Sequence, residues 1–115
     1  GWRQDIPAIL KASDIALLTS DNEAVALTLI EATQAAIPVV TTSAGSVRDV
    51  ARDSENGFVT GFSSEALANA ILKLADSPAL RKEFGEAGKS RSDTLFSIER
   101  MVTDHEILYK ELHRK

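Results

Sequence analysis

Apolar residues along the chain fall into two patterns, short aliphatic runs and longer segments with helical spacing. The runs at 15–18, 39–41 and 58–59 are rich in valine, isoleucine, leucine and phenylalanine and have the length of short buried strands. Between and after these runs, apolar residues recur every three or four positions, which is typical of helices. The pattern predicts helices at residues 5–11, 27–35, 47–52, 64–76, 79–87 and 98–112.

The order of these elements predicts an α/β fold. Strands that alternate with helices are typical of parallel sheets, and three strands are about half of the roughly six in a complete doubly wound sheet. We therefore expect a partial doubly wound, Rossmann-like parallel sheet of about three strands flanked by helices. Asp5 is expected to cap the first helix, and Ser77-Pro78 to stop the helix that begins at Ser64. No linker or repeat divides the sequence, so residues 1–115 are predicted to form a single domain.

Composition narrows the classes of function. The 115 residues are 43% hydrophobic and 26% charged, and the net charge of −4 without a basic run argues against a nucleic-acid partner. The chain has no cysteine, which removes disulfides, thiolate nucleophiles and the commonest zinc ligands. No apolar run approaches the ~20 residues of a membrane-spanning helix, and no signal-peptide pattern precedes the first strand. These features favour a cytoplasmic protein.

Two glutamates, Glu23 and Glu31, are the strongest candidates for a binding site. Glu23 follows the strand at 15–18, and Glu31 lies on the helix at 27–35 that leads to the next strand. In open α/β sheets, ligands bind beyond the carboxyl ends of the strands. A pair of carboxylates there suits a ligand with many hydroxyl groups, because ionised carboxylates accept strong hydrogen bonds.

A series of motifs, in fixed order and spacing, resembles the C-terminal domain of retaining family-4 glycosyltransferases of the GT-B fold. The resemblance covers nearly the whole chain, so it implies that this sequence is the second half of such a domain. The motifs are GWRQDIP at 1–7, ASDI at 12–15, TS at 19–20, the span from Glu23 to Glu31, PVVTT at 38–42, GSVRDV at 45–50, NGFV at 56–59, EALA at 65–68, RKEFGEAG at 81–88 and FSIER at 96–100.

The resemblance implies a role for each acid. In the family, the residue that matches Glu23 binds hydroxyls of the transferred sugar, which makes Glu23 the catalytic candidate, and the residue that matches Glu31 accepts hydrogen bonds from the ribose of the nucleotide. Each acid has a plainer alternative. Glu23 can be a solvated loop acid, and the sequence Thr28-Leu29-Ile30-Glu31 matches a helix capping box.

The residues between the two acids depart from the family pattern. The family usually has glycine followed by small residues or proline, whereas this chain has Ala24, Val25 and Ala26 before Leu27. The resemblance implies that backbone amides of these four residues approach the donor diphosphate, an anion that a helix N-terminus favours. Ala24 lacks the easy access of glycine to positive φ, and its methyl group is expected to crowd the sugar.

Three further positions are candidate contacts to the donor. Gly45 and Ser46 follow the second strand, and the resemblance implies that they face a phosphate or sugar; the alternative is an ordinary strand-to-helix turn. Arg3 stands where the chain of the family approaches the nucleotide, whereas Trp2 is expected to pack over the sheet edge. Ser20 has no paired histidine, so it is not predicted to be a nucleophile.

Glycine is also lost elsewhere relative to the family. Ala36, Ser46 and Ser54 stand where the family commonly has glycine. A left-handed backbone at Ala36 would cost about 1 kcal/mol relative to glycine. Asp49 matches an acidic position of the family, and we expect it to tie down its loop.

The predicted function is binding of a nucleotide-sugar donor in a retaining glycosyltransferase, which transfers the sugar to an acceptor in the full-length enzyme. The donor is a substrate, and neither a cofactor nor a metal is expected, since His105 and His113 lie on one helix without a cluster of acids. A sugar epimerase would need a histidine and further acids, and a phosphorylase would need a pyridoxal lysine; neither set stands out here. A non-catalytic interaction module is the main alternative, which the half-domain and the lost glycines favour.

The resemblance implies partners outside these residues. The family's C-terminal domain begins with three more strands and the Arg and Lys that grip the diphosphate, and a separate N-terminal domain holds the acceptor. We therefore expect the isolated chain to be inactive, and peripheral membrane association only through those outside segments. An unpaired strand at 15–18 predicts a homodimer, unless the helix at 98–112 folds back over the exposed surface.

Overall fold

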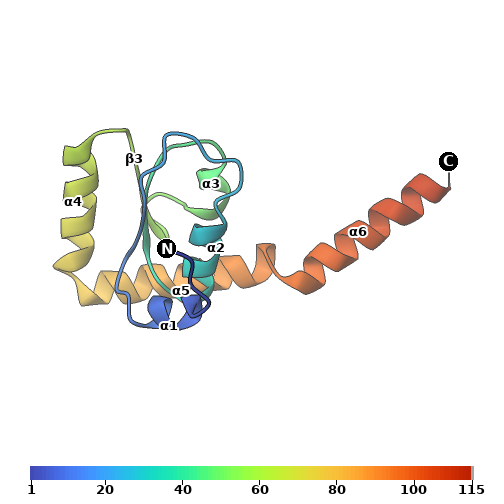
Figure 1. Ribbon diagram of the computed structural model, residues 1–115, viewed down its shortest axis with the longest axis horizontal. Coiled ribbons are helices and arrows are strands. Elements are labelled where there is room, and N and C mark those ends of the chain that lie inside the picture. The colour runs from blue at the N-terminus through green and yellow to red at the C-terminus, as the bar shows by residue number, and fades with distance from the viewer. Residues whose placement is uncertain (115) are drawn as a thin grey trace.

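The computed structural model describes residues 1–114, which form a three-stranded parallel sheet with helices on both faces (Figure 1). The strands lie in the order β1-β2-β3, with Ala16 opposite Val39 and Val40 opposite Phe58. Their bounds are β1 Ala16–Leu18, β2 Val39–Thr42 and β3 Gly57–Thr60. The predicted α/β class with about three parallel strands is confirmed.

Helices surround this sheet and connect its strands. One face is covered by α4, and the other by α2 and α3, while α5 runs across one end of the layers and packs against α2 and α4 (Figure 1). The bounds are α1 Ile6–Lys11, α2 Leu27–Gln34, α3 Val47–Val50, α4 Ser64–Ala75, α5 Pro78–Leu95 and α6 Ile98–His113.

The middle strand β2 is buried on both faces. Side chains alternate across a strand, so Val39 packs into a cluster with Leu29 of α2, whereas Val40 packs into a second cluster with Leu74 and Phe84. Both valines are fully buried. Burial on two faces explains why β2 reads in the sequence as an apolar run without polar alternation.

Helix α5 is longer than the sequence predicted. The predicted helix ended at residue 87, next to Gly88, but α5 continues to Leu95. Its glycines are contact positions: a Cβ on Gly85 would lie 2.1 Å from the carbonyl oxygen of Ala36, and one on Gly88 would lie 3.3 Å from Thr33 Cγ2. Gly85 and Gly88 therefore permit a close approach of α5 to α2 and its end, and Gly88 does not mark a helix end.

The backbone is left-handed at two of the positions where the family commonly has glycine. The φ angle is 59° at Ala36 and 61° at Ser54. The expectation of a left-handed conformation at Ala36, just after the C-cap of α2, is thus met. Ser46 has φ of −87°, so its replacement of glycine carries no such strain.

Replacing Ala36 by glycine should raise the free energy of unfolding by about 0.5–1 kcal/mol, because the strain of the left-handed alanine exceeds the entropy that glycine adds to the unfolded chain. Ala35, with φ of −81°, is the matched control. Ala35→Gly should lower stability, since glycine gains nothing there. Urea titration of both variants measures the two shifts, and shifts of the same sign would contradict the strain at Ala36.

The segment before α1 differs from its prediction in two respects. Asp5 occupies the N-cap position of α1, but its side chain makes no capping hydrogen bond and instead binds Arg3. Trp2 does not pack over the sheet edge, because 92% of its surface is exposed. Local ion pairing thus prevails over capping at Asp5.

The last helix does not fold back over the sheet. Every residue of α6 is exposed, and the helix projects away from the rest of the molecule (Figure 1). The expectation that it covers the exposed surface is therefore wrong, and the homodimer through β1, the edge strand on which Leu17 is 52% exposed, stays a prediction. Within residues 1–114, none of the helices is both long and apolar enough to cross a bilayer.

Candidate functional site

Two loops meet at the carboxyl ends of β1 and β2. Residues 19–26 connect β1 to α2, and residues 43–46 connect β2 to α3. Because β1 and β2 are parallel neighbours, these ends share one edge of the sheet, where α/β folds bind ligands. The edge carries Glu23, the candidate that the sequence ranked first.

The Glu23 carboxylate is held by a hydroxyl group. Ser20 Oγ donates to Glu23 Oε1 at 2.5 Å, and both groups are half-buried. The carbonyl of Ser20 is itself bound, since Thr42 Oγ1, at the end of β2, donates to it at 2.6 Å. Glu23 is therefore not a freely solvated loop acid.

The second loop crosses directly over the first. Gly45 has φ of 51°, and a Cβ on it would lie 1.8 Å from the carbonyl oxygen of Glu23. The amide of Ser46 donates to that same oxygen at 3.3 Å, and Ser46 Oγ donates to the carbonyl of Ala24. Gly45 and Ser46 thus fix the backbone on both sides of the Glu23 side chain.

Helix α2 begins beside this crossing without a side-chain cap. Its N-cap residue is Ala26, which is buried, whereas Ala24, Val25 and Leu27 are exposed. The carbonyl of Ala26 accepts from the third and fourth amides of the helix. The Leu27 amide donates to the Val25 carbonyl at 2.9 Å, so among the first four amides of α2 only that of Thr28 makes no hydrogen bond within residues 1–114. The start of α2 therefore offers this amide to an anion in place of a capping side chain. Ala24 does not adopt positive φ, so its predicted strain is absent.

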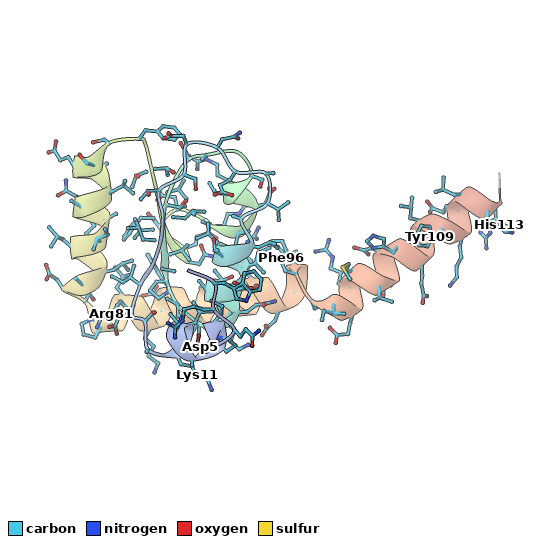
Figure 2. The ribbon with its side chains drawn as sticks, in the orientation of Figure 1. Asp5, Lys11, Arg81, Phe96, Tyr109 and His113 are labelled. Carbon is cyan, nitrogen blue, oxygen red and sulfur yellow. The ribbon has the colours of Figure 1, made fainter. Side chains whose placement is uncertain are left out.

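Glu31 does not belong to a capping box. Since α2 starts at Leu27, Thr28 lies inside the helix and is not its N-cap, and Glu31 lies one turn further along. The capping alternative is therefore wrong. The exposed Glu31 lines two surface hollows, one shared with α1 and one shared with Phe96 and Ser97 between α5 and α6. Figure 2 labels Phe96, which follows the last residue of α5.

Arg3 is engaged away from the two loops. Its Nε and Nη2 donate to the Asp5 carboxylate at 2.8 Å and 2.6 Å. This hydrogen bond raises the pKa of Arg3 above its usual value and lowers the pKa of Asp5. Within the described residues, no hydrogen bond joins Arg3 to the Glu23 loop.

Helix α3 is anchored from the opposite side. The backbone carbonyl of Asp49 accepts from Arg91 Nη2 of α5 at 2.9 Å. After α3, the side chain of Asn56 bridges its own loop, because it accepts from the Arg52 amide at 2.7 Å and donates to the Val50 carbonyl at 3.0 Å. These bonds hold α3 and therefore the turn at Gly45. Among residues 1–114, no group of three or more acidic, histidine or cysteine side chains is placed to hold a metal ion.

Comparison with known proteins identifies the family. A profile described as "Glycosyl transferases group 1" matches residues 1–91, which include all three strands and both loops of the site. The chain belongs to this family. The expected resemblance to a GT-B C-terminal domain is thereby confirmed at the level of family and fold.

The group 1 glycosyltransferase chain is similar to proteins several times its length. N-acetyl-alpha-D-glucosaminyl L-malate synthase of Bacillus anthracis is 24% identical over 99% of this chain and 30% of its own length. A glycosyltransferase from Rickettsia africae superposes with a TM-score of 0.91 at 26% identity, over 98% of this chain and 31% of its own. HepE of Anabaena, solved in complex with UDP, superposes with a TM-score of 0.86 at 26% identity. The match covers 100% of this chain and 31% of HepE. This chain thus spans about 30% of the length of these three relatives.

Sequence reasoning missed two residues of the candidate site. Ser20 and Thr42 were noted only as parts of family motifs, and Ser20 was set aside as a nucleophile, yet together they hold the Glu23 loop. A usable signal was present in the sequence. Ser20 stands three residues before Glu23 in a loop, a spacing at which a hydroxyl reaches a neighbouring acceptor.

Proposed function

We propose that this chain forms the donor-binding part of a retaining glycosyltransferase, which transfers a sugar from a nucleoside diphosphate to an acceptor in the full-length enzyme. Glu23 receives hydroxyls of the transferred sugar, Glu31 receives the ribose, and residues 24–27 with Gly45 and Ser46 face the diphosphate. The amides of Leu27 and Ser46 already donate to the carbonyls of Val25 and Glu23, so these two residues contribute without their amides. Arg3 reaches the nucleotide only if it leaves Asp5, so its contribution is the smallest.

One arrangement carries this function: an anchored carboxylate next to an uncapped helix N-terminus at the carboxyl edge of a parallel sheet. The carboxylate accepts hydrogen bonds from a polyol, and the helix end favours a phosphate. A nucleotide sugar combines both chemical groups in one molecule. The complexes of the similar protein HepE with UDP and with UDP-glucose support the same ligand class.

The chemistry that follows is electrostatic. The departing diphosphate gains negative charge during transfer, and amides at the start of α2 stabilise that charge without having to reorganise. Glu23 orients the sugar so that the acceptor attacks the face from which the diphosphate leaves. Residues outside this chain complete the diphosphate site and hold the acceptor.

Calorimetric titration of the full-length protein with UDP, GDP and ADP tests this function most directly. We expect one of the three to bind with a dissociation constant in the micromolar range, about −8 kcal/mol. If none of the three nucleotides gave a heat of binding, and none competed with another ligand for the site, a donor-binding role would be refuted.

Replacing Glu31 by glutamine in the full-length protein should weaken binding of the selected nucleoside diphosphate about tenfold, since a hydrogen bond to a charged acceptor is stronger than one to an amide. Gln34→Glu, on the same exposed side of α2, is a control that leaves the ribose contact intact. Thermal unfolding of each variant should match the parent. If Glu31→Gln left the nucleotide affinity unchanged, Glu31 would be an ordinary surface residue that does not contact the ribose.

A binding module that has lost transferase activity is the second candidate. Left-handed Ala36 and Ser54 indicate that this chain tolerates strain where the family has glycine. Under this alternative the full-length protein binds a nucleoside diphosphate but does not cleave a bound nucleotide sugar, so no nucleoside diphosphate is released from it. Measurement of both properties separates the two functions.

A further inference from the structure

We propose that Ser20 is a positioning residue that orients the Glu23 carboxylate toward the sugar of the donor. This inference rests on the proposed function and adds to it a residue that does not itself touch the donor. Its basis is the hydrogen bond of 2.5 Å from Ser20 Oγ to Glu23 Oε1.

The hydrogen bond fixes which oxygen of Glu23 is free. A carboxylate has two oxygens and about four acceptor sites. Ser20 occupies one site on Oε1, while within residues 1–114 no hydrogen bond is made to Oε2. The oxygen that Ser20 leaves open is thus available to a sugar hydroxyl, and the torsions of the glutamate are set before the donor arrives.

The backbone of the Ser20 loop is anchored independently of its hydroxyl group. Thr42 Oγ1 donates to the Ser20 carbonyl at 2.6 Å, and the Ser46 amide donates to the Glu23 carbonyl at 3.3 Å. Thr42 is fully buried and belongs to β2. Removal of Ser20 Oγ therefore leaves both backbone anchors in place and frees only the carboxylate.

This separation distinguishes positioning from a merely structural role. If the serine only stabilised the loop, its replacement would lower the affinities for the nucleoside diphosphate and for the nucleotide sugar equally, because both ligands need the same loop. A serine that orients Glu23 affects only the part of the binding energy that the sugar adds. The difference in affinity between the two ligands is thus the diagnostic quantity.

The experiment uses the full-length protein and calorimetry with four pairs of probes: UDP and UDP-glucose, UDP and UDP-N-acetylglucosamine, GDP and GDP-mannose, ADP and ADP-glucose. The pair with the tightest nucleotide sugar is then measured for Ser20→Ala, Ser20→Thr and Ser64→Ala. Ser64 is an exposed serine at the start of α4 and serves as the matched control. Thermal unfolding verifies that each variant is folded.

Ser20→Ala should bind the nucleotide sugar about tenfold more weakly, with the affinity for the nucleoside diphosphate unchanged within twofold, as expected for loss of one hydrogen bond to a charged group. Ser20→Thr retains the hydroxyl and should retain at least half of the affinity. Ser64→Ala should match the parent. In a Glu23→Ala background, Ser20→Ala should have no further effect on sugar affinity, because that variant has no side-chain acceptor for Ser20 to orient and the two residues act through one contact.

Other outcomes overturn the inference. Equal losses for both ligands of the pair would show that Ser20 only holds the loop, and full affinity of Ser20→Ala would show that Glu23 needs no orientation. If the parent protein bound the nucleotide sugar no more tightly than the nucleoside diphosphate, the proposed contact between Glu23 and the sugar would be refuted. A parent that binds none of the probes would refute the proposed function together with this inference.

Discussion

Replacement of Gly45 by alanine should lower the free energy of unfolding by about 2–4 kcal/mol, the range of severe backbone strain and overpacking. The new Cβ would lie 1.8 Å from the carbonyl oxygen of Glu23 and 2.8 Å from its carbonyl carbon. Both atoms belong to backbone, which cannot move aside as a flexible side chain does. The φ of 51° at Gly45 adds a conformational penalty for any residue with a Cβ.

Relief of this clash requires the two loops to separate. Separation breaks the hydrogen bond from the Ser46 amide to Glu23 and releases the loop that carries the carboxylate. We therefore expect Gly45→Ala in the full-length protein to lose nucleotide-sugar affinity by more than tenfold as well. The loss of stability and the loss of affinity have one cause in this variant.

Gly61→Ala is the matched control. A Cβ on Gly61 would meet nothing within 4 Å, and its φ is not positive. Its stability in urea titration should differ from the parent by less than about 0.5 kcal/mol, as for ordinary surface changes. Equal behaviour of the two alanine variants would mean that the loops do not cross as closely as the structure places them.

The middle strand of the sheet was predictable because it is buried on both faces. Val39 and Val40 face opposite layers, so the strand shows an unbroken apolar run that local pattern reveals. Helix α5 was predicted too short because Gly88 is ambiguous in a sequence: the same residue that ends a helix also permits close packing, and only the position of Thr33 decides between them.

The sequence pointed to two candidate acids but not to the residues that hold Glu23 in place. The resemblance to a family led to Glu23 and Glu31, yet only tertiary structure reveals that Thr42 holds the Ser20 loop, because these residues are 22 positions apart. Asp5 shows that a contact between near neighbours in the sequence can also be missed. It stands at the N-cap as predicted, but an ion pair with Arg3 two residues away competes for its carboxylate.

Replacement of Glu23 by alanine should reduce turnover of the full-length enzyme by about 100-fold or more, the effect of removing one preorganised polar contact at the reacting group. Affinity for the nucleoside diphosphate should change by less than about threefold, because the proposed partner of Glu23 is the sugar and the amides of α2 remain. Release of nucleoside diphosphate from the bound nucleotide sugar measures turnover, and calorimetry measures affinity.

Glu55→Ala supplies the control for loss of a glutamate. Glu55 is exposed in the loop before β3, outside the two loops of the site, and its removal should leave turnover within about twofold of the parent, as for other surface changes. Glu23→Gln adds a finer comparison, because it keeps the size of the side chain and replaces its charge. If Glu23→Ala lowered nucleotide affinity and turnover by the same factor, the carboxylate would act on the nucleotide or on the loop, and the sugar contact would have to be assigned to another residue.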